Sequence, residues 1–126
     1  MNDPFILVKL FLSDGEYHDA LTEMRSLPKR ARSSVPAIEL YLRILTGLGK
    51  FELCEMATKA LLDDLVPSDE TLESIARFRL EQARSRLREE NQEGAKHSLR
   101  DALQTWPPIR AEVESDPELT NLGTLL

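Results

Sequence analysis

Apolar residues recur along the chain with the three- and four-residue spacing of amphipathic helices, and no stretch alternates with the period of two typical of strands. Capping residues, glycines and prolines divide this pattern into segments. We predict helices over about residues 4–14, 17–27, 36–47, 51–64, 69–90 and 92–105. A short helix near 109–114 and a last turn opened by Asp116-Pro117 are expected to close the chain.

Two segments carry more specific expectations. In the third helix, we expect Ile38, Tyr41, Leu42 and Leu45 to face inward. The basic stretch Lys29–Ser34 follows Pro28 and is predicted to be a solvated loop. A nucleic-acid patch, an import signal or a phosphorylation site are the alternatives for this stretch.

Composition limits the class of protein. The 126 residues, 41% of them hydrophobic and 30% charged, suit one folded domain over 1–126. The net charge of -6 argues against charge-driven nucleic-acid binding. Cys54, the single cysteine, excludes an intramolecular disulfide and favours a cytoplasmic location. The apolar run from Phe5 to Leu12 contains Lys9 and is too short to span a membrane, so we expect a buried helix and no membrane partner. A helix that docks a partner or has a mild affinity for membranes is the alternative for this run.

The predicted helical segments contain a repeated pattern of residues. Gly15 and Tyr17 recur as Gly49 and Phe51, 34 residues later. A weaker third copy has Glu90 at the glycine position and no aromatic residue after it. The predicted repeats cover about 1–34, 35–67 and 68–107, with a closing segment over 108–126.

This period resembles that of the tetratricopeptide repeat (TPR) family. The matching residues are Gly15, Tyr17, Ala20, Met24, Leu45, Gly49, Phe51, Cys54, Leu61, Ala83, Ala95, Leu99, Ala102 and Pro107. The resemblance implies an all-α fold, a right-handed superhelix of antiparallel helix pairs that bury small residues between them. It also implies a protein-binding scaffold without catalysis. The chain departs from the family's clamp for chaperone tails, because Phe5 and Leu80 stand where lysines would be.

In the family, the first helix of each pair lines a concave groove. The resemblance therefore implies a peptide-binding groove lined by Phe5, Lys9, Leu12, Arg43, Arg77, Leu80, Arg84, Leu87 and Arg88. Its cations suit an acidic or carboxylate-bearing peptide. Two alternatives stay open. In the first, the arginines form ion pairs with Glu73, Glu81, Glu89 and Glu90, where Arg77–Glu81 and Arg86–Glu90 are four residues apart. In the second, Phe5 and Leu12 are buried by neighbouring helices.

No catalytic, metal-binding or cofactor-binding set is readable, since His18 and His97 are the only histidines and no glycine-rich phosphate loop is present. We therefore expect a non-catalytic protein–protein interaction module whose partner is another protein or peptide. The alternative is a self-associating scaffold, a homodimer held by its apolar first helix or its closing segment. That segment carries four acids and one base after Pro107 and suits the arginine side of another copy.

Overall fold

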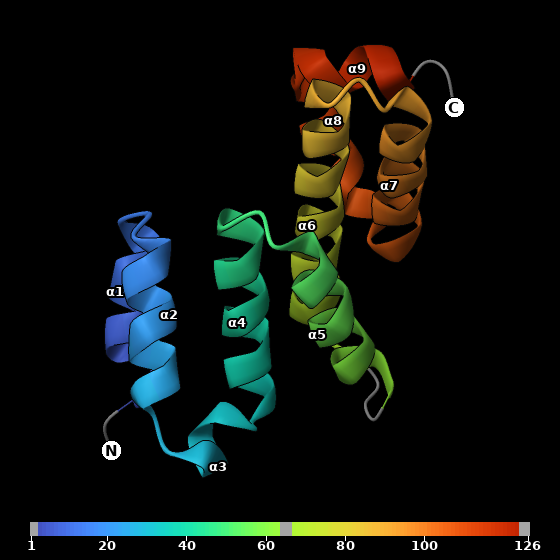
Figure 1. Ribbon diagram of the computed structural model, residues 1–126. Coiled ribbons are helices and arrows are strands. Elements are labelled where there is room, and N and C mark those ends of the chain that lie inside the picture. Colours follow the sequence, from blue (N-terminus) through green and yellow to red (C-terminus); the bar gives the residue numbers. More distant parts are fainter. Residues whose placement is uncertain (1–2, 64–66, 124–126) are drawn as a thin grey trace. The chain divides into compact units, whose positions relative to one another are not determined.

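The computed structural model describes residues 3–63 and 67–123 (Figure 1). Within these residues the chain forms helices and turns and no strand, which confirms the all-α class. The chain divides into two compact units, Met1–Val66 and Pro67–Leu126. The predicted end of the fourth helix at residue 64 lies outside the described residues.

The first unit contains helices α1 (Ile6–Ser13), α2 (Tyr17–Ser26), α3 (Lys29–Arg32), α4 (Val35–Gly47) and α5 (Phe51–Asp63). Consecutive long helices are joined by short connections, so α1 packs on α2, α2 on α4, and α4 on α5. Apolar residues from α1, α2 and α4 form one core. Its buried members are Phe5, Val8, Leu12, Ala20, Leu21, Met24, Ala37, Leu40 and Ile44.

Helix α4 is buried on two sides. Ala37, Leu40 and Ile44 belong to the core with α1 and α2, whereas Leu42 and Leu45 are buried elsewhere on the same helix. Helix α5 covers the second side: the sulfur of Cys54 lies 3.6 Å from Thr46 Oγ1 and 4.0 Å from the carbonyl oxygen of Leu42. The inward face predicted for this helix is therefore only half right, because Ile38 and Tyr41 are only partly buried.

The basic connector is also corrected. Residues Lys29–Arg32 form the short helix α3 and not an irregular loop. Pro28, with φ -57° and ψ 146°, precedes the helix and sets its start. Ser34 then ends the connector, and its hydroxyl accepts a hydrogen bond from the Ala37 amide at the start of α4.

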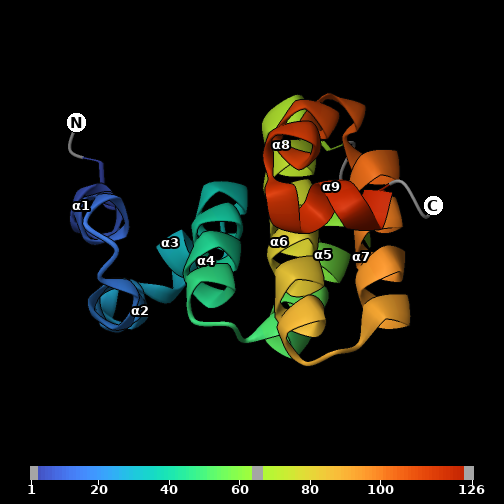
Figure 2. The same ribbon diagram turned by 90° about the horizontal axis from the view of Figure 1, so that it is seen from above.

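The second unit contains α6 (Asp69–Arg88), α7 (Gln92–Thr105), the 3-10 helix η1 (Pro107–Ile109), α8 (Arg110–Ser115) and α9 (Pro117–Gly123). Helices α6 and α7 pack closely through small residues, and α9 lies across this pair (Figures 1 and 2). The sequence prediction of 92–105 for α7 is confirmed. The core of this unit comprises Ala76, Leu80, Ala83, Ala95, Leu99, Ala102, Ile109, Val113, Leu119 and Leu122, with Trp106 packed against it.

The three helix pairs turn in the same way. Gly15, Gly49 and Glu90 have φ of 72°, 71° and 61°, the left-handed conformation that ends a helix. The amides of Gly15 and the following Glu16 donate to the carbonyl oxygens of Leu12 and Phe11. The amides at the other two turns donate with the same spacing. Glu90 is therefore a non-glycine residue in a conformation that favours glycine.

Candidate functional site

Three arginines lie along one side of α6 and each contacts a carboxylate from the end of the chain. We call Arg77, Arg84 and Arg88 the arginine row, and residues 107–123 the acidic closing segment. Their partners in that segment, in the same order, are Glu112, Asp116 and Glu118. The arginines and their partners follow each other in the same order along the sequence. The direction of the chain from α8 to the start of α9 is therefore parallel to that of α6.

Arg84 forms the most enclosed of these pairs. Its Nη2 lies 2.7 Å and its Nε 2.9 Å from Asp116 Oδ2, and Glu81 on α6 contacts its Nη1. The other carboxylate oxygen of Asp116 accepts a hydrogen bond from the Glu118 amide at 2.9 Å. Asp116 thus binds α6 with one oxygen and caps α9 with the other.

The electrostatics of the pair match this geometry. The hydrogen bond from Arg84 lowers the pKa of Asp116 below its ordinary value of 3.8; partial burial opposes this shift and the Glu118 amide adds to it. Burial of the guanidinium disfavours its charged form, yet the hydrogen bonds and charges of Asp116 and Glu81 outweigh burial and raise the pKa of Arg84. The pair is therefore fully ionised at neutral pH.

The outer pairs of the row are more exposed. Arg77 donates through Nε to Glu73 at 3.2 Å and through Nη1 to Glu112. Arg88 Nη2 lies 3.8 Å from Glu118, and its side chain is 66% exposed. The expected pairing of arginines with Glu73 and Glu81 is confirmed. The particular pair Arg77–Glu81 is wrong, because Glu81 contacts Arg84, and Arg77 contacts Glu73 and Glu112.

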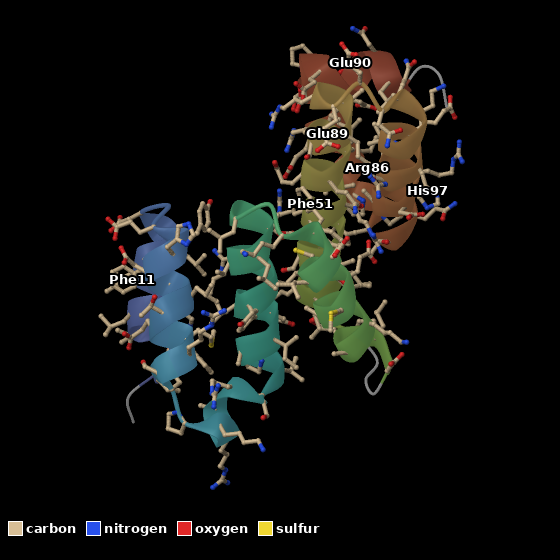
Figure 3. All side chains as sticks on the ribbon, viewed as in Figure 1. Phe11, Phe51, Arg86, Glu89, Glu90 and His97 are labelled. Atoms are coloured by element: carbon tan, nitrogen blue, oxygen red, sulfur yellow. The ribbon has the colours of Figure 1, made fainter. Side chains whose placement is uncertain are left out.

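Arg86 is held by neutral groups and not by Glu90. Figure 3 shows it between α6 and α7, where its Nη1 donates to the Gly94 carbonyl at 3.1 Å and to Ser98 Oγ at 2.6 Å. Ser98 is buried and donates in turn to Gln82 Oε1 at 3.0 Å. The expected Arg86–Glu90 pair is wrong because α6 ends at Arg88, so Glu90 does not continue the helical spacing.

The predicted apolar lining residues are mostly buried. Phe5 and Leu12 belong to the core of the first unit and Leu80 to that of the second, with exposed fractions of 8%, 8% and 1%. Leu87 is partly buried against the same core as Leu80. The expectation that Phe5, Leu12 and Leu80 contact a ligand is therefore corrected, because the neighbouring helices already cover these side chains.

The predicted cations of the first unit lie on its surface. Lys9 Nζ on α1 lies 2.7 Å from Asp3 Oδ2, an exposed ion pair that lowers the pKa of Asp3. Arg43 on α4 is exposed, and its side chain forms no hydrogen bond or ion pair with any described residue. Of the predicted basic residues, Arg43 alone therefore has its charge uncompensated by a described carboxylate.

An exposed apolar surface on α1 is the feature that the helix spacing missed. Ile6, Leu7 and Leu10 are 54%, 48% and 57% exposed, and we call them the α1 strip. They lie on the side of the helix opposite the buried Val8 and Leu12. The signal in the sequence is the nearly unbroken apolar run from Phe5 to Leu12, which supplies more apolar positions than one buried face requires.

The described residues offer little for other chemistry. His18 is exposed, and the exposed His97 lies 3.4 Å from Asp101 on its own helix. Cys54 is fully buried, in agreement with its expected packing role. In residues 3–63 and 67–123, no group of three or more histidine, cysteine or acidic side chains is placed to hold a metal ion. No helix in these ranges combines the length and apolar character needed to cross a membrane.

Comparisons with models of protein families, with curated proteins and with solved structures find no match. The resemblance to tetratricopeptide repeats therefore stays a prediction from the sequence.

Proposed function

We propose that this protein is a non-catalytic protein–protein interaction module that self-associates through the α1 strip. One observation carries the proposal: α1 is apolar on both sides, and only one side is covered. A helix that is apolar all round is typical of a buried position. Single exposed apolar side chains are common on protein surfaces, but the two leucines and one isoleucine of the α1 strip form a contiguous patch typical of an interface.

A second copy of the chain is the partner that fits the strip best. In a twofold dimer the same patch meets itself, so an apolar strip is its own complement. Two charges beside the strip, Lys9 and Asp3, are paired with each other at 2.7 Å. This ion pair therefore adds no net charge to an interface along this edge.

The expected affinity is modest. Burying the exposed half of each leucine or isoleucine contributes about 1 kcal/mol, so the six side chains of a dimer contribute about 6 kcal/mol. Association itself costs roughly 4–15 kcal/mol. Contacts beside the strip must therefore contribute too, and we expect a dissociation constant of about micromolar or weaker.

The test compares Leu10→Lys with Ser13→Lys. Both variants add one positive charge to an exposed position of α1, but only the first interrupts the strip. Light scattering over a concentration series should show the mass of the wild type and of Ser13→Lys rising toward that of a dimer. Leu10→Lys should stay monomeric with an unchanged helical circular dichroism spectrum. A monomeric wild type, or association of Leu10→Lys equal to that of wild type, contradicts the proposal.

Binding of an acidic protein segment is the second candidate function. It is supported by the exposed and uncompensated charge of Arg43 on α4. A synthetic peptide with the sequence of residues 107–123 is a suitable acidic probe. Arg43→Glu should weaken its binding, measured by fluorescence anisotropy, while the thermal midpoint stays unchanged. Equal binding by Arg43→Glu and wild type contradicts a role for Arg43.

A further inference from the structure

The acidic closing segment packs on the α6–α7 pair through both apolar and charged side chains. It contributes four of the ten buried residues in the core of the second unit: Ile109, Val113, Leu119 and Leu122. Its acids contact the arginine row at the same time. The segment is thus recognised by an apolar surface bordered by guanidinium groups, a combination that selects an acidic amphipathic segment.

The link between α7 and this segment is short and distinct. Helix α7 ends at Thr105, and Trp106 is extended, with φ -146° and ψ 89°. Pro107 and Pro108 follow, and the first of them disfavours helical conformation at Trp106. The link therefore separates two regular elements, and exchange of the closing segment requires Trp106 to leave its place against the core and to break the hydrogen bonds of its amide with Ala102 and of its carbonyl with Ile109.

We infer that the α6–α7 pair also accepts the acidic closing segment of a second copy, so that two chains exchange these segments. Outside the link at Trp106, the exchanged form repeats the contacts between the closing segment and the α6–α7 pair, with Asp116 of one copy on Arg84 of the other. Such exchange of an identical element is a low-cost route to a dimer. The closed chain prevails at low protein concentration, since its own segment has a high effective concentration. Exchange involves no residue of the α1 strip and goes beyond the proposed function.

The charges of the central pair provide a selective test. In Arg84→Asp, the new carboxylate faces Asp116 and Glu81; in Asp116→Arg, two guanidinium groups face each other. Mixing the two variants restores opposite charges at both sites only if the segments are exchanged. Both variants are made in the Leu10→Lys background, so that association through the α1 strip does not contribute. The double variant Arg84→Asp/Asp116→Arg is the control, because opposite charges meet within one chain.

Native mass spectrometry and light scattering should show a one-to-one heterodimer in the mixture. Its dissociation constant should be lower than that of either variant alone by about a hundredfold, since two repulsive pairs become attractive and each contributes about tenfold. The double variant should remain monomeric at the same concentration. If each variant alone is unfolded, mixing should restore the helical circular dichroism signal. A mixture that behaves as the sum of its components, or a double variant that dimerises equally, overturns the inference. The α1 proposal is unaffected by either result.

Discussion

Arg84 and Asp116 lie 32 residues apart in the sequence, yet two nitrogen atoms of the arginine lie 2.7 and 2.9 Å from one carboxylate oxygen. Both side chains are only 21% exposed. A charged pair with this geometry is stronger than the exposed pairs beside it. It joins the closing segment to α6. We therefore expect the free energy of unfolding to fall when acid protonates Asp116.

We expect Asp116→Asn to lower the free energy of unfolding at neutral pH by about 1 kcal/mol, since the neutral amide loses the charged contact with Arg84. The folded-state pKa of Asp116 is lowered. The contribution of Asp116 is therefore complete above the unfolded value of about 3.8 and disappears as the pH falls through the lower folded value. Urea unfolding across acidic pH should show wild type and Asp116→Asn converging toward the acid end. Glu118→Gln, at the weaker 3.8 Å contact, is the control and should change little.

Substitutions at the three helix turns should change the free energy of unfolding in different directions: two should lower it and one should raise it. Gly15→Ala and Gly49→Ala should each destabilise the protein by about 1 kcal/mol, because alanine disfavours positive φ. An added Cβ meets no atom within 4 Å at either glycine, so the cost is one of backbone conformation. Glu90→Gly should stabilise by about 0.5 kcal/mol, since it relieves the same strain at the third turn. Thermal unfolding checks all three, with Glu89→Gly, at φ -88°, as the control expected to destabilise.

Gly47 should be intolerant of a side chain for a different reason. A Cβ at this position on α4 would collide with the ring of Tyr17 on α2. Gly47→Ala should therefore destabilise by about 1–3 kcal/mol, the usual effect of overpacking. In the Tyr17→Leu background the same substitution should cost less. Denaturant unfolding of the four chains in this double-mutant cycle would measure the coupling; additive effects would contradict the contact.

The Arg86–Ser98–Gln82 chain of hydrogen bonds should depend on its central hydroxyl. Ser98→Ala leaves the Gln82 oxygen and one guanidinium nitrogen with fewer partners, and should lower the free energy of unfolding by about 1–3 kcal/mol. Ser115→Ala is the control, because its hydroxyl is exposed and bonds only the Glu112 carbonyl. Equal small losses for the two variants in urea unfolding would show that the buried chain contributes no more than a surface hydrogen bond.

Patterns over a few neighbouring residues correctly predicted helix bounds and turns, because these features depend on local interactions. The apolar period and the caps placed α7 at 92–105, and the glycines at 15 and 49 marked turns with positive φ. The same reasoning missed α3, because its four residues, three bases and one alanine, are too few to show an apolar period. It also assigned one inward face to α4, whereas α2 and α5 cover this helix on two sides.

The sequence by itself determined the helical class, the turns and the gathering of arginines on one side of α6, since these depend on neighbours within a few residues. The tertiary structure decided which charges and apolar surfaces remain available. Arg84 contacts Asp116, and Leu80 is buried, because segments distant in the sequence pack together. The spacing of apolar residues within one helix does not predict such contacts. Ile6, Leu7 and Leu10 stay exposed because one side of α1 suffices for the core of its unit. The physical reason is that a side chain is buried only by contact with another segment. The sequence of one helix shows which of its faces is apolar, but not which segment covers that face.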